Sequence, residues 1–405
     1  MSRVWIISEY YFPNGNTTSH IMTRIAEGTA AGGAADVNVI TSTAAPEGFA
    51  AGDERRDGVR IFRTRDSRFD KNVLHQRILR ITLLGVRLLR KASALVKPDD
   101  TVLVVTNPAT IIFLIRLLRA FKRFRLVVLV HDIFPENLIA AGIIKGKTAP
   151  YRMTLAAFNW AYRKADRLVV IGRDMADFMR LKLGPSCPPI SFIPNFADVR
   201  AIEPRPRAQN ELLRAHGLAG KFVVLFVGNI GRAQDFPNIL RTMELLREHR
   251  EIHLLIVGDG VNAATVRRFV EDKGLDSITL LPSMPRDSEN VFLNAGDVGL
   301  VSLQKGRRGI VSPSKAYPLL AAGKPLLAVA DPGSEIELMV KEANCGWWCE
   351  PGDPEALSGL VLRISRAAGE VAEKGLIARR LAVDEYSIEK VIPRFRPLLV
   401  PGEER

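Results

Sequence analysis

The chain has 405 residues and a formal net charge of +13, and it is 47% hydrophobic and 25% charged. This composition excludes a disordered chain, and a length well above the ~150 residues of one ordinary domain favours two globular domains. The amino-terminal stretch MSRVWIIS fits a first buried strand better than a secretory signal, so we expect an intracellular protein. Three cysteines, at positions 187, 345 and 349, match no zinc or redox spacing and are expected to be buried free thiols.

Apolar runs alternate with helical patterns along most of the chain. In the first half, seven runs are expected to be strands: VWIIS, VNVIT, VRIFR, TVLVVT, RLVVLVH, RLVVIG and ISFIPN. Five follow in the second half: FVVLFVG, IHLLIVGDG, ITLLPS, VGLVSL and PLLAVA. Near-continuous Val, Ile and Leu runs are typical of parallel strands covered on both faces. The pattern predicts an α/β protein with two doubly wound parallel sheets.

The domain boundaries follow from composition. Residues 194–210, PNFADVRAIEPRPRAQN, are rich in proline and charge and are expected to form the linker. The first domain would then span residues 1–196 and the second residues 211–375, facing each other across a cleft. The helical residues 376–405 add no strand and could pack back onto the first domain.

Ligands bind beyond the carboxyl ends of parallel strands, so the loops that follow strands are the candidate sites. Gly15 and Asn16 open a polar turn that could present backbone donors to an anion or simply cap a helix. His131, Asp132 and Glu136 follow another expected strand. They suit positioning a hydroxyl or moving a proton, and the alternative is an ordinary capped helix start.

In the second half, the loop FVGNIGRAQDF follows a strand. Its Gly228 would allow close approach of a ligand, and Asn229, Arg232 and Gln234 offer hydrogen-bond donors. The turn VGDG, which ends at Gly260, is expected to lead into a helix without a functional role. The earlier turn at Gly15 carries no G-x-G-x-x-G pattern, which disfavours a dinucleotide site there.

The stretch SPSKAYPLLAAGKP contains a proline inside a short helical pattern. If Ser314 caps this helix, Pro318 occupies its fourth position and removes about one hydrogen bond. Lys315 would then lie beside free N–H groups that favour an anion, which indicates a diphosphate site. Gly323 is expected to end the helix.

Most of the excess of positive over negative charge lies between residues 71 and 131. Helical patterns over residues 74–96 and 111–126 place apolar residues on one face and cations on another. They predict binding to an anionic membrane surface through Arg77, Arg80, Arg87, Lys91, Arg116, Arg119 and Arg123. Ordinary sheet-covering helices with solvated arginines are the alternative. Nucleic acid is disfavoured because the cations lack interleaved aromatic residues and no nucleic-acid-binding motif is present.

Eight motifs in chain order resemble glycosyltransferase family 4: HDIFPENL, FIPNFAD, FVGNIGRAQ, LLIVGDG, ITLLPSMPR, AGDVGLV, SPSKAYPLLAAGKPLLAV and GWWCEPGDPEAL. The resemblance covers nearly the whole chain and is strongest over residues 222–357. Within the family, the chain is most similar to the N-acetylfucosamine-type transferases of bacterial O-antigen and capsule synthesis. The resemblance implies the GT-B fold, with two Rossmann-like domains.

The same resemblance implies a reaction. A sugar, expected to be an N-acetylated amino- or deoxyhexose, would move from a UDP-sugar to a lipid-diphosphate-linked glycan. Transfer would proceed with retention, without a metal or other cofactor, in a cytoplasmic enzyme on the inner face of the cell membrane. A UDP-sugar 2-epimerase of the same architecture and a basic polyanion-binding protein are the alternatives.

Residue roles also follow from the resemblance. It implies that Arg232 and Lys315 hold the diphosphate, with Ser314 beside them, and that the base lies near Arg286. His131, Asp132 and Glu136 would orient the sugar and the acceptor, and the acceptor would lie near Gly15.

The chain also departs from the family pattern. Ile310 and Pro318 stand where many members carry two glutamates, so Glu335 is expected to hold the ribose instead. Asn229 and Gln234 replace the usual arginine and lysine of their loop.

Overall fold

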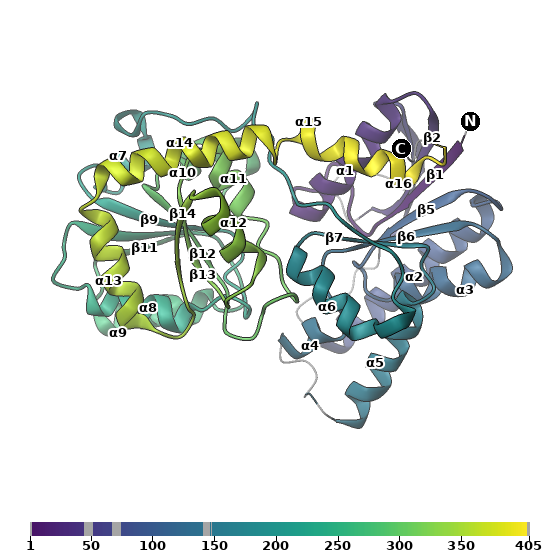
Figure 1. The fold of residues 1–405 in the computed structure, drawn as a ribbon, viewed down its shortest axis with the longest axis horizontal. Helices are drawn as coiled ribbons and strands as arrows, with labels where there is room; N and C mark the ends of the chain where they lie inside the picture. Colours follow the sequence, from purple (N-terminus) through teal and green to yellow (C-terminus); the bar gives the residue numbers. More distant parts are fainter. Residues whose placement is uncertain (1, 44–51, 67–73, 141–145, 147, 403–405) are drawn as a thin grey trace. The chain divides into compact units, whose positions relative to one another are not determined.

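The chain forms two compact units in the computed structural model, which describes residues 2–43, 52–66, 74–140, 146 and 148–402. The first unit contains Met1–Pro194 together with Glu389–Arg405, and the second contains Asn195–Ile388. Each unit has one sheet with helices on both of its faces (Figure 1). The predicted α/β architecture with two parallel sheets is therefore confirmed.

The first unit holds an eight-stranded sheet in the order β3-β4-β2-β1-β5-β6-β7-β8. All seven strands expected in this half are present: β1 (Ser2–Ile7), β2 (Ala35–Ser42), β4 (Val59–Thr64), β5 (Thr101–Val105), β6 (Arg125–Val130), β7 (Arg167–Val170) and β8 (Ile190–Phe192). The sequence does not predict β3 (Asp53–Arg56), which has the sequence DERR and pairs antiparallel with β4 at the sheet edge. This strand forms through edge pairing, because it has no apolar run of its own.

The connections of this sheet decide which face each helix covers. The crossovers from β4 to β5, β5 to β6 and β6 to β7 run in one direction across the sheet, whereas β1 to β2 runs in the other. Right-handed crossovers therefore place α2 (Leu74–Leu95), α3 (Ile111–Phe121) and α5 (Ala149–Tyr162) on one face. The opposite face carries α1 (Thr17–Ala31), near α16 (Arg396–Leu399) (Figure 1). The remaining helices of this unit are α4 (Glu136–Ala140) and α6 (Arg173–Leu183).

The second unit holds a parallel six-stranded sheet in the order β11-β10-β9-β12-β13-β14. The five expected strands are β9 (Phe222–Val227), β10 (Ile252–Val257), β11 (Ile278–Leu281), β12 (Val298–Ser302) and β13 (Leu326–Val329). The sequence does not predict β14 (Gly346–Cys349), whose sequence GWWC contains no Val, Ile or Leu. All three cysteines are free thiols; Cys345 and Cys349 are buried as expected, whereas Cys187 of the first unit is partly exposed.

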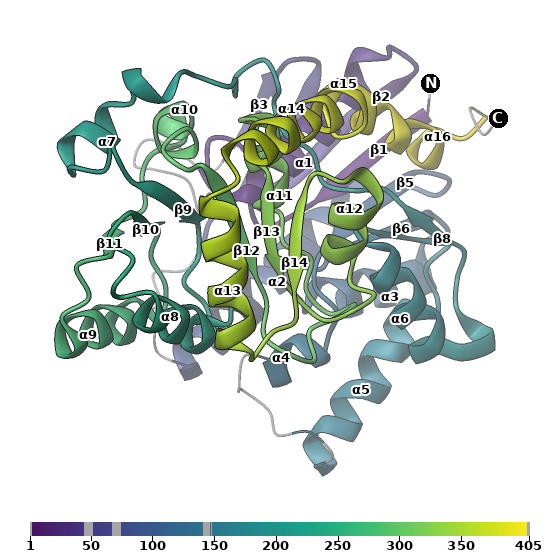
Figure 2. The same ribbon diagram turned by 60° about the vertical axis from the view of Figure 1, so that its left-hand side comes forward.

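Helices cover both faces of this second sheet (Figure 2). Along β9, Val223 and Leu225 pack with α11 (Ala316–Ala321), α12 (Glu335–Ala343) and α14 (Ala368–Asp384). Val224 and Phe226 point the other way and pack with α8 (Phe236–Leu245), α9 (Ala263–Lys273) and α13 (Pro354–Ser365). Because side chains alternate along a strand, a strand buried on both faces must be apolar throughout. The short helices α7 (Glu211–Ala215) and α10 (Glu289–Leu293) complete this unit.

Most of the expected linker over residues 194–210 is a packed part of the second unit. Ala197 and Ile202 lie in its core, and Arg379 of α14 donates hydrogen bonds to the carbonyl oxygens of Val199 and Ile202. The expected boundary at residue 375 falls within α14. The chain then returns to the first unit through α15 (Ile388–Val391), and Arg396 donates to the Gly32 carbonyl oxygen.

Helix α11 begins one residue later than expected, because Lys315 rather than Ser314 occupies the N-cap position. Pro318 is therefore the third helical residue, and its missing N–H belongs to the first turn, where such groups have no intrahelical partner. The expected loss of one hydrogen bond does not occur. The expected stop is present, since Gly323 has φ +68° directly after the helix.

The glycines of the loops after β9 and β10 fit closely together. A Cβ atom on Gly258 would lie 1.9 Å from the carbonyl oxygen of Gly228. The turn VGDG thus has a packing role.

We expect Gly258→Ala to lower the free energy of unfolding by about 1–3 kcal/mol, because the added methyl group collides with backbone. Denaturant unfolding measures this loss. Gly359→Ala is the matched control, because Gly359 lies in α13 with open space around it and should gain up to about 1 kcal/mol. Equal stability of Gly258→Ala and the unmodified protein would contradict the close fit.

Candidate active site

The loops at the carboxyl edge of the second sheet are tied to one another by backbone hydrogen bonds. Gly228 donates to the Val257 carbonyl oxygen at 2.9 Å, and Ile230 donates to that of Asp259 at 2.8 Å. The Asp331 carboxylate accepts three backbone N–H groups from residues 306–308, at 2.8–3.1 Å. The loops after β9, β10, β12 and β13 therefore form one connected rim, as required for a preorganised ligand site.

Lys315 places an amine at this rim without a polar partner. Its Nζ is buried, has no hydrogen-bond partner in the described structure, and lies 3.6 Å from the ring centroid of Phe226 in β9. Burial alone lowers the pKa of the Lys315 amine to about 7. A buried amine without a polar partner lowers the stability of the ligand-free protein. Such an arrangement is typical of a cation that binds an anionic ligand.

Ile310 and Pro318 stand at the two positions where the family resemblance implies glutamates, and Pro318 lies within α11. Glu335, the candidate for the ribose, is the first residue of α12, follows β13 and is only 4% exposed. Ser334 before it has a buried hydroxyl with no hydrogen-bond partner among the residues that the structure describes. Ser314 lies in the turn that precedes α11 and is half-buried.

The remaining candidates of the second unit differ in place and contacts, since Asn229, Arg232 and Gln234 lie on the rim whereas Arg286 follows β11. Arg232 and Asn229 are exposed in the loop after β9. The side-chain carbonyl oxygen of Gln234 accepts a hydrogen bond from the Gly231 N–H at 2.9 Å, so the role of Gln234 is partly structural. Arg286 is exposed and lies 3.9 Å from the Glu289 carboxylate.

The first unit presents a second buried polar group at the carboxyl ends of β5 and β6. Thr106 Oγ1 accepts the backbone N–H groups of His131 and Asp132, both at 3.2 Å. Burial lowers the pKa of the His131 imidazole to about 4 and raises the pKa of the Asp132 carboxyl to about 6. His131 Nε2 has no partner among the described residues. The neutral His131 imidazole and the nearby Asp132 carboxyl can both form hydrogen bonds with a hydroxyl group of a ligand.

Glu136 is already engaged. Its carboxylate forms a buried ion pair with Lys182 of α6, which fixes the start of α4 to a neighbouring helix. Burial lowers the pKa of the Lys182 amine, although Glu136 opposes the shift. Glu136 therefore positions the His131 loop rather than offering a free carboxylate. The sequence holds no signal for Lys182, which lies 46 residues away.

Asn16 is a helix cap, the plainer of the two expectations for its turn. Its side-chain oxygen accepts the Ser19 N–H at 2.8 Å at the start of α1. Gly15 is exposed and has no crowding that requires glycine.

Arg80 does not face a membrane. It is 3% exposed and pairs with the carboxylates of Glu9 and Asp66, the first at 2.8 Å. The reason is its helical position, since Arg80 shares one stripe of α2 with the buried residues Leu84, Leu88 and Ala92. This i, i+4 spacing is the sequence signal that could have identified it as buried.

Other cations expected at the membrane also have protein partners. Arg87 donates to the Arg65 carbonyl oxygen at 2.8 Å, Lys91 lies 3.3 Å from Asp53, and Arg119 pairs with Asp166 at 2.6 Å. The side chain of Arg77 lies outside the described part of the structure. Across the described residues, we find no helix with both the length and the apolar character needed to cross a bilayer.

We expect Asp132→Asn to stabilise the protein at neutral pH. The carboxyl pKa is higher in the folded chain, so stability falls as pH rises from about 4 to about 6, and above pH 6 the buried charge costs about 3 kcal/mol. Urea unfolding should show a gain of up to about 3 kcal/mol near pH 7.5 and little gain near pH 4. Asp177→Asn, at an exposed residue of α6, is the control. An unchanged free energy of unfolding near pH 7.5 would contradict the burial of charge.

Two family models match the chain, one to each half. Residues 17–195 match the glycosyl transferase 4-like domain, and residues 209–374 match the glycosyl transferases group 1 model. The chain is 33% identical to the probable glycosyltransferase WbjE of Pseudomonas aeruginosa, over 98% of this chain and 99% of that protein. It is 26% identical to the putative colanic acid biosynthesis glycosyl transferase WcaI of Escherichia coli K12, over 69% of each chain.

Solved structures with the same fold include sucrose-phosphate synthase of Thermosynechococcus elongatus, with a TM-score of 0.80, 16% identity and 98% of each chain covered. Another is Anabaena HepE in complex with UDP-glucose, with a TM-score of 0.72, 14% identity and coverage of 98% and 99%. At these identities the likeness establishes the GT-B fold alone. Together with the full-length relative, the two matched domains show that the chain belongs to the group 1, GT4-like glycosyltransferases.

Proposed function

We propose that this glycosyltransferase moves an N-acetylated amino- or deoxyhexose from a UDP-sugar to a lipid-diphosphate-linked glycan in cell-surface polysaccharide synthesis, with retention of the anomeric configuration. Transfer needs no metal or other cofactor in this proposal. The observation that carries it is the buried, unpartnered amine of Lys315 on the rim of the second sheet. This group is suited to the negative charge of a leaving diphosphate.

The reaction breaks the bond between the anomeric carbon and the diphosphate oxygen, and an acceptor oxygen forms a new bond on the same face of the sugar. Negative charge develops on the departing UDP, and a protonated Lys315 stabilises it where little water competes. Arg232 adds a second cation to the same rim. The acceptor hydroxyl gives its proton to the leaving phosphate, so no separate protein base is required.

The donor's other parts have candidate partners on the same unit. Glu335, buried at the start of α12, is proposed to accept hydrogen bonds from the ribose hydroxyls, in place of the glutamates absent at Ile310 and Pro318. The base is proposed to lie near Arg286. The UDP complex of Anabaena HepE supports a UDP donor by analogy of fold only.

The acceptor is proposed to bind the first unit near His131 and Asp132. A neutral imidazole with a free Nε2 can accept a hydrogen bond from the acceptor hydroxyl and align it. The name of WcaI, a colanic acid biosynthesis enzyme, supports a polysaccharide product. We propose that the lipid part of the acceptor keeps the enzyme on the inner face of the cell membrane.

Incubation with UDP-sugars and a synthetic lipid-diphosphate sugar tests the reaction. We expect UDP release that depends on the acceptor, and a product with the donor's anomeric configuration by nuclear magnetic resonance. Inversion would contradict retention, and loss of activity in a chelator would contradict metal independence. Conversion of the UDP-sugar without acceptor would instead identify an epimerase.

We expect UDP affinity to fall as pH rises above about 7, because burial lowers the Lys315 pKa to about 7 and the neutral amine cannot pair with phosphate. Once Lys315 is neutral in the free protein, affinity should drop up to tenfold per pH unit. Calorimetric titration in two buffers between about pH 7 and 9 measures affinity and proton uptake.

Two variants serve as controls for this pH dependence. Lys315→Arg should bind UDP with little dependence on pH, because a guanidinium stays charged throughout this range. Lys315→Met should bind weakly at every pH. A pH-independent affinity of the unmodified protein would remove Lys315 from the diphosphate site.

A further inference from the structure

Three neighbouring helices of the first unit form a face without a single carboxylate. Helices α2, α3 and α5 cover the same side of the sheet, and none of them contains Asp or Glu. They are in direct contact, since Phe113 of α3 and Phe158 of α5 have ring centroids 4.5 Å apart. Because Gly85 of α2 has no side chain, α3 also packs closely against α2. We define the outer surface of these three helices as the α2–α3–α5 face.

Large apolar side chains are exposed on this face at helical spacing. Each helix exposes a pair that recurs after one or two turns: Leu79 and Val86 on α2, Leu117 and Phe121 on α3, and Met153 and Trp160 on α5. Phe121 is 87% exposed and Met153 is 74% exposed. Exposed apolar residues in such an array mark an interaction surface rather than scattered surface hydrophobes.

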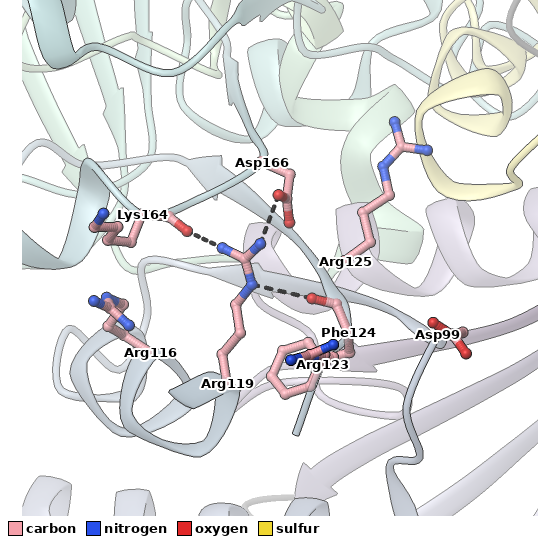
Figure 3. A pocket seen from close by; sticks show the side chains of 8 residues that line it. All are labelled: Asp99, Arg116, Arg119, Arg123, Phe124, Arg125, Lys164 and Asp166. Carbon is pink, nitrogen blue, oxygen red and sulfur yellow. Dashed lines mark hydrogen bonds and ion pairs between the residues drawn. The ribbon is translucent and has the colours of Figure 1, made fainter. Parts of the chain in front are cut away.

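A basic pocket lies where α3 and α5 end, beside the first residue of β6. Its volume is about 700 Å³, and it is lined by Phe124, two aspartates and five cations: Asp99, Asp166, Arg116, Arg119, Arg123, Arg125 and Lys164 (Figure 3). The Arg119 guanidinium is anchored, since it donates to the Phe124 carbonyl oxygen at 3.0 Å and to Asp166 at 2.6 Å. Asp166 is thereby neutralised, and the pocket retains an excess of positive charge.

We propose that the α2–α3–α5 face is the surface that docks on an anionic lipid bilayer, with a headgroup phosphate in the basic pocket. This inference rests on the proposed function, which places the acceptor on a lipid, and it names the surface and the lipid chemistry. Leu117, Phe121 and Trp160 enter the interfacial layer of the membrane. Arg116, which lies 4.6 Å from the Trp160 ring, together with Arg123 and Lys164, pairs with the phosphates.

The positive charge of the α2–α3–α5 face favours a bilayer over the other partners that this face could bind. A second copy of the chain would bring the same surface against itself, since a two-fold interface is self-complementary, and cations would meet cations. A nucleic acid would satisfy the cations but offers no apolar layer for Phe121 and Met153. A bilayer with anionic headgroups satisfies both, because basic residues pair with phosphate while apolar side chains reach the acyl boundary.

The test is flotation of the full-length protein with vesicles of phosphatidylcholine alone or mixed with phosphatidylglycerol. We expect binding to the mixed vesicles, weakening with salt, and little binding to phosphatidylcholine alone. Phe121→Ser combined with Arg123→Gln should reduce the bound fraction about tenfold or more. The matched control combines Leu376→Ser with Arg268→Gln at exposed residues of the second unit and should float like the unmodified protein.

Three outcomes would overturn the docking surface. The first is unchanged flotation of the Phe121→Ser, Arg123→Gln variant. The second is a dimer of the unmodified protein in light scattering that this variant no longer forms. The third is RNA binding that this variant loses, together with failure of the unmodified protein to float. UDP affinity and transfer to a soluble acceptor are measured without vesicles, and the variant should retain both. Flotation without transfer would leave the docking surface intact and remove the proposed function, and transfer without flotation would do the opposite.

Discussion

Burial of ionisable groups is the constraint on which the candidate site depends. The Lys315 amine, the His131 imidazole and the Asp132 carboxyl all lie at carboxyl edges of the two sheets, and burial alone shifts each pKa against its charged form. Such groups destabilise a folded protein unless a ligand supplies the missing charge or hydrogen bond. The surrounding core must therefore hold them in place, and two apolar layers do so in the second unit.

The rim of the second sheet illustrates how this is achieved. Gly258 approaches the Gly228 carbonyl so closely that no side chain fits, and the Asp331 carboxylate fixes the backbone of residues 306–308. These contacts hold the loops in place without using Lys315, whose amine lies 3.6 Å from the ring centroid of Phe226. The backbone contacts therefore preorganise the site, while the charge of Lys315 is left for a ligand to balance. This is what a site for a charged ligand requires.

The positive charge of the chain divides into two groups with different roles. Arg80, Arg119 and Lys182 each pair with a carboxylate and join separate segments of the first unit. Arg116 and Arg123 instead line an open pocket next to exposed aromatic residues. Net charge therefore describes this surface poorly, because burial and pairing decide which cations are available to a partner.

The sequence alone determined the architecture and the location of the candidate loops. Continuous apolar runs predicted twelve of the strands, because a strand buried on both faces must be apolar along its whole length. The sequence did not predict β3, whose DERR sequence pairs at a sheet edge, or β14, whose GWWC sequence contains no Val, Ile or Leu. Only the tertiary structure decided which charges are buried. Glu9, one partner of Arg80, and Lys182, the partner of Glu136, lie 71 and 46 residues away along the chain, and the ring beside the Lys315 amine belongs to β9, so no local pattern identifies these neighbours.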